Sequence, residues 1–460
     1  MKTSVIGYPR IGKNRELKFA SEKFFKGEIS EAELLQVAAE IKKEGLLKQK
    51  QAEISFIPSN DFSFYDNVLD AAFLFNIIPA RYSALGLSEL ETYFAMARGY
   101  QGDKGNVKAL AMKKWFNTNY HYIVPEIDDD TEIKLNRNKV VDEYKEAKEN
   151  GVDTKAVLVG PFTLLKLAKY TGTKSAKDFA GVLTENYSIL IEKLEKEGAE
   201  WIQFDEPSLV KDLTQDDINL FKEIYSIVLK KRVSIKVLLQ TYFGDIRDIY
   251  SEVTALGFDG IGLDFLEGRK TLELVKSNGF PEDTVLFAGL VNGKNIWKNN
   301  YAKTIDLLKD IKSVTKNVVL GTSCSLLHVP YTLASESKLS DDYLKHFAFA
   351  EEKLEELKEI SRLSDFAESG NVAAQVTFTN NQKLFHGRVD SVDEAVKERV
   401  AGIKESDYTR LPEFHEREKI QKEKLNLPLF PTTTIGSFPQ TQDVRQNRQK
   451  LRKGLISKEE

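Results

Sequence analysis

The chain has 460 residues, of which 41% are hydrophobic and 30% charged, and this balance is that of a folded globular protein. Its 66 lysines and arginines against 70 aspartates and glutamates give a net charge of -4, so the bulk charge favours neither nucleic acid nor an anionic membrane as a partner. The single cysteine, Cys324, excludes an internal disulfide and indicates a reducing compartment. With no signal peptide and no run of about 18 apolar residues, we expect a cytoplasmic protein that binds neither nucleic acid nor membranes.

Up to about residue 335, short β-branched and aromatic runs alternate with longer amphipathic, charged stretches. This alternation is typical of βα units around a parallel sheet. The candidate strands are Ser4–Tyr8, Ile54–Pro58, Tyr120–Pro125, Ala156–Gly160, Trp201–Asp205, Ile235–Thr241, Gly260–Asp264, Val285–Leu290 and Val318–Thr322. The pattern predicts an α/β fold, a (β/α)8 TIM-like barrel over residues 1–335, with nine runs competing for eight strand positions.

Several of these strands end in small or polar residues, among them Asp205-Glu206-Pro207 and Asp264. Active sites of parallel barrels lie at the C-terminal ends of the strands, so a binding mouth is expected there. The alternative is that glycine and proline only punctuate loops at these positions. Between Leu74 and Asn117 we expect a longer, helical connection that covers part of the barrel.

Residues 336–430 differ in composition and are predicted to form a helical and hairpin linker region. We expect an amphipathic helix over Ser335–Ser361, whose charge run at residues 351–358 faces solvent. Alternation within Asn371–Gly387 predicts a hairpin that turns at Asn380-Asn381. Two charged helices, over Val392–Lys404 and Glu413–Leu425, are expected to follow before a proline-bearing stretch ends the linker.

The end of the chain repeats its beginning. Thr3-Ser4-Val5-Ile6-Gly7-Tyr8-Pro9 is followed by Arg15, six residues after the proline, and Thr433-Thr434-Ile435-Gly436-Ser437-Phe438-Pro439 is followed by Arg445 at the same distance. A basic, helix-like stretch comes next in both places. The repeat indicates a duplicated domain, with residues 431–460 as the first strand and helix of a second, truncated barrel. Chance similarity of two strand-turn-helix units is the alternative.

The clearest candidate for ligand binding follows the first strand. Arg15 and Lys18 stand three residues apart and would share one face of a helix, and Arg10 and Lys13 lie in the preceding loop. A helix N-terminus with clustered cations is a good receptor for carboxylate or phosphate. Simple solvation of these side chains is the alternative.

A second basic pair, Lys113-Lys114, precedes the aromatic and amide-rich stretch of residues 115–122. Cations interleaved with aromatics suit a planar anionic ligand. A strand edge packed on the core would have the same appearance.

Candidate acids and metal ligands give weaker signals. Asp205 and Glu206 are adjacent, so in a regular strand they would face opposite sides, and either could be a general acid or base or cap a helix. Asp264 could be an inward-pointing carboxylate at the end of its strand. Cys324 and His328 lack the further ligands that a zinc site needs. The simplest interpretation of Cys324 is a small side chain buried in the core.

Five segments together carry a resemblance to a known family. They are Ile6-Gly7-Tyr8-Pro9-Arg10-Ile11-Gly12 with Arg15-Glu16-Leu17-Lys18; Lys114-Trp115-Phe116-Asn117-Thr118-Asn119-Tyr120-His121-Tyr122; Gly160-Pro161-Phe162-Thr163; Asp205-Glu206-Pro207; and Thr432-Thr433-Thr434-Ile435-Gly436-Ser437-Phe438-Pro439-Gln440-Thr441. In order and over nearly the whole chain they resemble the cobalamin-independent methionine synthase family. The resemblance implies two face-to-face (β/α)8 barrels. It also implies methyl transfer from 5-methyltetrahydrofolate polyglutamate to L-homocysteine, giving L-methionine, without cobalamin.

The resemblance also implies roles for individual residues. Those expected to contact the folate and its glutamate tail are Arg15, Glu16, Leu17, Lys18 and Lys114. Those matching the turn that holds the amino-acid end of homocysteine or methionine are Ile435, Gly436 and Ser437. A polyglutamate carries several carboxylates, so cations are also what the chemistry requires at the first group.

The resemblance implies zinc in the full-length enzyme, held by histidine, cysteine and glutamate residues of the second barrel. The segments of the first barrel that look equivalent, Thr241–Gly244 and Gly321–Ser325, lack that ligand set. We therefore expect no metal ligand and no catalytic residue in this chain. We expect it to be inactive alone, with the missing C-terminal barrel as its partner.

Two other functions stay open at this point. The first is a non-catalytic binding or scaffold barrel that docks a catalytic partner domain. The second is a stand-alone barrel enzyme that uses Asp205, Glu206 or Asp264 as acid or base.

Overall fold

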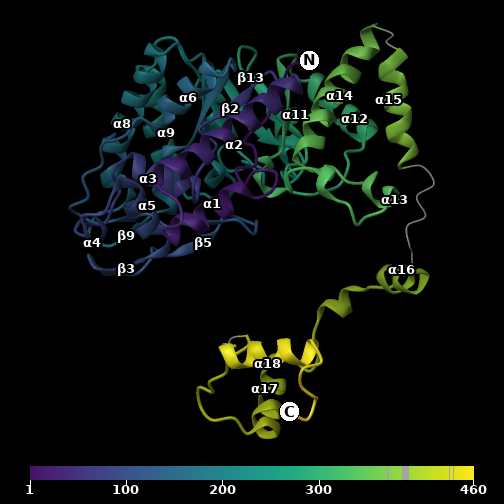
Figure 1. Cartoon of the computed structure of the whole chain (residues 1–460). Coiled ribbons are helices and arrows are strands. Elements are labelled where there is room, and N and C mark those ends of the chain that lie inside the picture. The colour runs from purple at the N-terminus through teal and green to yellow at the C-terminus, as the bar shows by residue number, and fades with distance from the viewer. Residues whose placement is uncertain (370–371, 386–392, 435, 439) are drawn as a thin grey trace. The chain divides into compact units, whose positions relative to one another are not determined.

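A computed structural model describes residues 1–369, 372–385, 393–434, 436–438 and 440–460. The chain divides into two compact units, Met1–Arg388 and Val389–Glu460 (Figure 1). The two units are taken separately below.

The first unit is built on one sheet of eight strands, in which every paired neighbour is parallel. In chain order the strands are β1 (Thr3–Ser4), β2 (Ile57–Ser59), β8 (Thr154–Val159), β10 (Trp201–Asp205), β11 (Lys236–Gln240), β12 (Gly260–Asp264), β13 (Val285–Val291) and β14 (Val318–Thr322). From β2 onward each strand pairs with the next, and β14 pairs with β1. The ring closes where the amide of Phe56, just before β2, donates to the carbonyl of Thr3 at 2.9 Å. This arrangement confirms the predicted (β/α)8 barrel.

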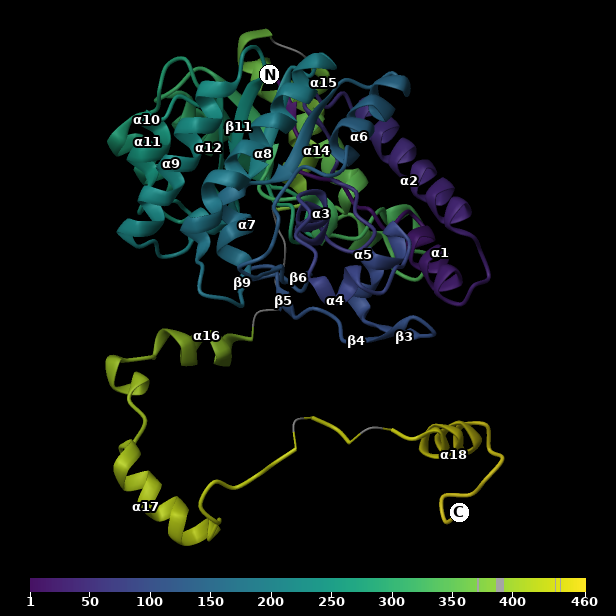
Figure 2. The same ribbon diagram turned by 90° about the vertical axis from the view of Figure 1, so that its left-hand side faces the viewer.

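Helices cover the outside of the barrel (Figures 1 and 2). They are α1 (Glu16–Phe25), α2 (Glu31–Gln51), α6 (Lys139–Glu149), α7 (Pro161–Leu167), α8 (Ala176–Lys196), α9 (Gln215–Lys231), α10 (Tyr250–Ala255), α11 (Thr271–Asn278) and α12 (Tyr301–Lys312). Sequence signals fix several of their starts: Ser30 with Glu33 at α2 and Thr214 with Asp217 at α9 form capping boxes. Their apolar faces and the outer faces of the strands form one continuous core.

The long connection after β2 mixes helices with two hairpins. Its helices are α3 (Asn67–Leu74), α4 (Ala80–Ser83) and α5 (Glu89–Arg98), and its strands are β3 (Tyr100–Gly102), β4 (Gly105–Val107), β5 (Met112–Lys114) and β6 (His121–Ile123). The candidate strand Tyr120–Pro125 lies here and contains β6, so it is the one of the nine candidate runs that takes no position in the barrel. β6 pairs antiparallel with β5, which removes it from the all-parallel ring and resolves the surplus of nine runs over eight positions. β7 (Glu126–Ile127) follows β6 in the chain and pairs in parallel with β9 (Lys169–Tyr170), which lies beyond β8.

The segment after β14 packs on the barrel through α14 (Ala350–Ser369) and α15 (Val372–Lys383). The predicted helix over Ser335–Ser361 therefore begins later, after the short helices η3 (Leu333–Ser335) and α13 (Asp341–Leu344). Its charge run does not lie wholly in solvent: Lys353 and Glu356 are each only 1% exposed. Lys353 donates to the carbonyl of Trp297 at 3.3 Å, and Glu356 accepts from the amide of Asn299 at 2.7 Å.

The hairpin predicted within residues 371–387 was also wrong, because its described part is helix α15. Asn381, expected in the turn, is 4% exposed. Its side chain accepts from the amide of Tyr301 at 3.0 Å and donates to the carbonyl of Asn299 at 2.9 Å. These two bonds fix α15 to the start of α12. Asn371, residues 386–387 and Val392, which bounded two of the predicted elements, lie outside the described residues.

The second unit contains α16 (Glu394–Ala401), α17 (Phe414–Leu425) and α18 (Gln442–Arg452). These agree with the helices expected around residues 392–404 and 413–425 and with the basic helix of the repeat. The described residues of 431–441 form no strand, in contrast to the expected repeat of β1. A lone strand has no stable conformation without a partner to pair with. Nowhere in the described ranges of either unit is there a helix long and apolar enough to cross a membrane.

Candidate functional site

The C-terminal ends of the barrel strands open into a cavity with a polar floor and aromatic walls. Asp205 at the end of β10 lies on the floor, and Trp115, Tyr120, Tyr242 and His328 contribute rings to the walls. Of these rings, those of Tyr120 and His328 are in contact, with centroids 6.0 Å apart. The sequence prediction of a binding mouth at these strand ends therefore corresponds to a real cavity.

Asp205 is held by a buried polar network inside the barrel. The side-chain amide of Gln203 donates to its Oδ1 at 2.7 Å, and the hydroxyl of Tyr242 donates to its Oδ2 at 3.1 Å. Lys155 of β8 donates in turn to Oε1 of Gln203. Burial raises the pKa of Asp205 and lowers the pKa of Lys155, and the attraction between the two opposes both shifts.

Glu206 points to the other side of the strand from Asp205, as the alternation of a regular strand predicts. Its carboxylate accepts from the amides of Phe162 and Thr163, at 3.0 and 2.7 Å, and from the hydroxyl of Tyr225 at 2.6 Å. Burial raises the pKa of Glu206 to about 7, and these donors oppose the rise. Glu206 thus caps α7, and its oxygens are engaged away from the barrel mouth.

The carboxylate of Asp264 is likewise occupied by hydrogen bonds from backbone amides. Its carboxylate accepts hydrogen bonds from the amides of Phe243, Leu266 and Glu267, at 3.0, 2.8 and 3.0 Å. These bonds shape the loops after β11 and β12. The geometry therefore assigns Asp264 to loop structure, and of the three candidate acids only Asp205 lines the mouth.

The predicted cation cluster lies at the start of α1. Arg15 is the N-cap residue and adopts a left-handed conformation, with φ 64°. The cationic groups of Arg15 and Lys18 each lie 5.6 Å from the centre of the Phe19 ring, so they share one face as predicted. Glu16 accepts from the amide of Asn14 at 2.9 Å. Leu17 is 2% exposed and packs in the core.

Lys18 lines a cavity that is also lined by two hairpin neighbours of Lys114, which stands 96 positions further along the sequence. This cavity, of about 360 Å³, lies between α1 and the β5–β6 hairpin and is lined by Lys18, Met112 and His121, among others. Lys114 is paired directly with His121 across the hairpin. Residues i and i+2 of a strand share a face, as do directly paired residues of an antiparallel ladder. The side chain of Lys114 therefore lies on the face that carries Met112 and His121.

The predicted homocysteine-binding residues belong to the second unit. Ile435 lies outside the described residues. Gly436 has φ 71°, a conformation that favours glycine, and Ser437 is exposed.

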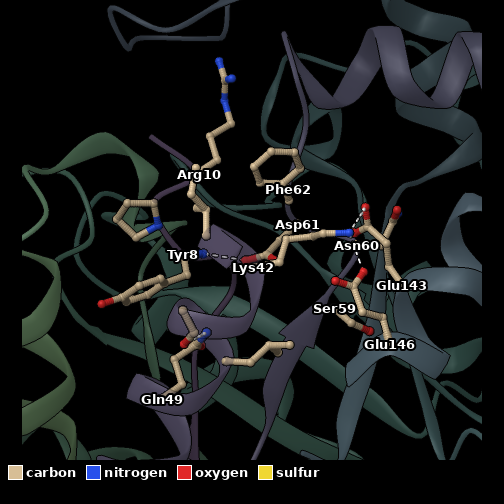
Figure 3. Close-up of a pocket in the computed structure, with 14 residues that line it drawn as sticks. Tyr8, Arg10, Lys42, Gln49, Ser59, Asn60, Asp61, Phe62, Glu143 and Glu146 are labelled. Carbon is tan, nitrogen blue, oxygen red and sulfur yellow. Dashed lines mark hydrogen bonds and ion pairs between the residues drawn. The ribbon is translucent and has the colours of Figure 1, made fainter. Parts of the chain in front are cut away.

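A further polar cluster, which the sequence analysis missed, surrounds a small cavity between α2 and α6 (Figure 3). The amide of Tyr8 donates to Oδ2 of Asp61 at 2.7 Å. Lys42 bridges Glu143, at 3.5 Å, and Glu146. No spacing in the sequence signals this cluster, because its members come from four separate segments that only the barrel brings together.

The donor set of the described chain does not fit a metal centre. Among these residues no group of three or more His, Cys, Asp or Glu side chains is placed to hold a metal ion. Cys324 is 1% exposed, and burial raises the pKa of its thiol. The ring of His328 packs between Tyr120 and Phe243.

These features define a parallel (β/α)8-barrel protein with a polar barrel mouth and a neighbouring cavity beside α1 that is lined by Lys18. Residues 2–316 match the family described as "Cobalamin-independent synthase, N-terminal domain", and residues 430–460 match "Cobalamin-independent synthase, Catalytic domain". The chain therefore belongs to the cobalamin-independent synthase family. The resemblance drawn from the sequence motifs is confirmed.

Relatives of known name agree with this assignment. A 5-methyltetrahydropteroyltriglutamate–homocysteine methyltransferase of Streptococcus suis is 55% identical over 460 residues, which are 100% of this chain and 60% of that protein. A protein of the same name from Campylobacter jejuni subsp. doylei is 52% identical over 457 residues, 99% of this chain and 60% of that protein. The chain thus spans about 60% of the length of these relatives.

Solved structures agree at the level of the fold. A B12-independent methionine synthase from Shewanella sp. W3-18-1, in complex with selenomethionine, superposes with a TM-score of 0.55 at 15% identity, covering 79% of this chain and 98% of that one. A putative vitamin-B12 independent methionine synthase from Listeria monocytogenes gives 0.54 at 16% identity, covering 80% and 99%.

Proposed function

We propose that this chain is the N-terminal part of a methyltransferase that moves a methyl group from 5-methyltetrahydrofolate polyglutamate to L-homocysteine, forming L-methionine. Its own part in the reaction is to bind the folate tail. The observation that supports this most directly is that Lys18 lines one cavity with Met112 and His121, the residues that share a hairpin face with Lys114. A chain of glutamates presents one carboxylate per residue, and spaced cations on a preformed surface match that pattern.

In this proposal the tail lies along the start of α1. Arg15 and Lys18 pair with its carboxylates from one face of the helix, and Lys114 approaches from the hairpin. Glu16 contributes its backbone, because the first amides of a helix have no partner within it and favour an anion. The side chain of Glu16 is turned to Asn14, which leaves its main chain for the ligand. Leu17 is buried and its amide donates to the carbonyl of Ile11 at 3.2 Å, so its part in the site is to hold the first turn of α1 in place.

The second part of the proposal concerns the catalytic domain that begins near residue 430. Ile435, Gly436 and Ser437 would hold the amino-acid end of homocysteine, with backbone amides that approach its carboxylate closely. Zinc chemistry in the full-length enzyme would need ligands other than the described residues, which do not fit such a centre. We therefore propose that the chain has no turnover alone and acts together with the remainder of the C-terminal barrel. We keep 1–335, 336–430 and 431–460 as the proposed domain limits and the cytoplasm as the proposed location.

Titration of the 460-residue protein with 5-methyltetrahydrofolate triglutamate tests the tail site. Lys18→Ala and Lys114→Ala are each expected to weaken binding by about three- to tenfold, the range of one partly solvated charge pair. Lys309→Ala is the control, because Lys309 is an exposed lysine on α12, far along the chain from this cavity. Equal affinity in all four proteins would refute the tail site and favour a barrel that serves only as a scaffold.

A further inference from the structure

Arg10 stands in the loop between β1 and α1, and it is not free to pair with a ligand. Its guanidinium donates to three consecutive carbonyls: Ser63 at 2.9 Å, Phe64 at 3.2 Å and Tyr65 at 2.6 Å. A planar fork of donors can serve several carbonyls at once, which an ammonium group cannot. Figure 3 shows Arg10 directed away from the carboxylates of the neighbouring cluster. Arg10 therefore ties the loop after β1 to the segment after β2.

That segment is itself held from the other side. Lys139, at the start of α6, donates to Oδ1 of Asn60 at 2.8 Å and to the carbonyl of Phe62 at 2.9 Å. Its charge is balanced by Asp70 and Glu143, each at 3.2 Å. Residues 60–65 thus form a fixed bridge between α6 and Arg10.

The same bridge carries the proposed tail site. Leu17 of α1 packs in one cluster with Phe62 and, at its edge, Phe64, so the first turn of α1 rests on residues 60–65. Arg10 also lies 5.9 Å from the centre of the Tyr120 ring. Arg10 and Tyr120 both line the cavity that contains Lys18.

We propose that Arg10 is a positioning residue for the folate tail: by binding the carbonyls of residues 63–65 it holds the first turn of α1, and with it Lys18, in register with the hairpin that carries Lys114. This inference rests on the proposed function. It assigns Arg10 a role without contact to the ligand, in place of the direct anion contact that the sequence suggested. Preorganised cations bind a flexible tail at a lower cost in ordering than mobile ones.

Two variants separate positioning from charge. Arg10→Met removes the donors, and Arg10→Lys keeps the charge but cannot bind three carbonyls. For each, the affinity ratio between 5-methyltetrahydrofolate triglutamate and its monoglutamate is measured, together with hydrogen exchange of the α1 amides without ligand. We expect faster exchange over Glu16–Phe25 in both variants and a fall of the ratio by about fivefold or more in both. Arg137→Lys is the matched control, since Arg137 also binds a backbone carbonyl, that of Phe73 at 2.6 Å, but lines a different cavity.

Each result decides a separate point. A wild-type ratio in Arg10→Lys would show that charge suffices and would overturn the inference, as would unchanged exchange in α1. A lower ratio in Arg137→Lys would also overturn it, because the effect would then be general loss of stability. If the unaltered chain shows no dependence on tail length, the proposed function fails as well. If it shows that dependence and Arg10→Lys retains it, only the role of Arg10 fails.

Discussion

The side-chain amide of Gln203 donates a hydrogen bond of 2.7 Å to Asp205, two residues further along the same barrel strand. Because residues i and i+2 of a strand share a face, both side chains lie inside the barrel, where Gln203 also accepts from Lys155. Lys155, Gln203 and Asp205 thus form one buried, hydrogen-bonded line of polar side chains that ends at the barrel mouth. Lys155 is the cation that compensates the charge of Asp205, and the carboxylate of Asp61 also acts on both groups.

Removing one charge of this line should cost more than removing both. Lys155→Met leaves the Asp205 carboxylate buried without a cation, and we expect the free energy of unfolding to fall by about 3–5 kcal/mol. Adding Asp205→Asn should restore part of that loss, so the double variant costs less than the sum of the two single ones. Denaturant unfolding followed by tryptophan fluorescence measures this, because all 3 tryptophans lie in the barrel unit. Additive costs would contradict the account.

The Glu206 cap of α7 makes a second prediction. In Glu206→Gln one carboxylate oxygen becomes an amide donor that faces another donor, so we expect a loss of about 1–3 kcal/mol in the free energy of unfolding. Gly160→Ala should be at least as damaging, because an added Cβ would collide with the Glu206 carboxylate. Glu149→Gln, at an exposed position of α6, is the control and should be neutral. Normal stability of both Glu206→Gln and Gly160→Ala would argue against the cap.

The lowered pKa of His328 predicts that the stability of the fold depends on pH. Burial, followed by repulsion from Lys294, lowers the pKa of His328 to about 4, below the unfolded value of about 6.5. The unfolded state therefore binds the proton first, so this stabilisation is complete above about pH 6.5 and is lost as the pH falls toward about 4. We expect wild type to lose about 3 kcal/mol relative to His328→Gln over that interval. A difference that does not change with pH would contradict the lowered pKa.

Cys324 gives a simple probe of barrel opening. It is the single cysteine, is 1% exposed and has a raised thiol pKa. Native protein should therefore react with a thiol reagent only as fast as the barrel opens, whereas denatured protein should react at once. Rapid stoichiometric labelling of the native protein would show that the structure around β14 is wrong.

The barrel was predictable because its strands are short apolar runs separated by amphipathic helices, a pattern that each βα unit repeats. The surplus strand at Tyr120–Pro125 could not be excluded from sequence, because its local composition is that of a barrel strand. Only its antiparallel pairing with β5 shows otherwise. In residues 372–383, alternation suggested a hairpin, but packing against α12 and α14 stabilises a helix there. Tertiary contacts override such weak local preferences.

The sequence identified the candidate cations as residue types, but it could not predict how they are arranged in space. The cations of α1 share one face because three-residue spacing places them there. The hairpin places Lys114 on the same face as His121, which lines the cavity with Lys18. Arg10 donates its hydrogen bonds to carbonyls of a segment more than 50 residues away. Neither arrangement can be recognised from the local sequence.

The most direct test of the central claim is a titration of the 460-residue protein with p-aminobenzoyl oligoglutamates, which carry the tail without the pterin. The account predicts saturable binding that strengthens with each added glutamate and is lost in the Lys18→Ala/Lys114→Ala double variant. It should also weaken between about 0.1 M and about 1 M salt, where the screening length falls from about 10 Å to about 3 Å. Absence of binding, or an affinity indifferent to the number of glutamates, would contradict it.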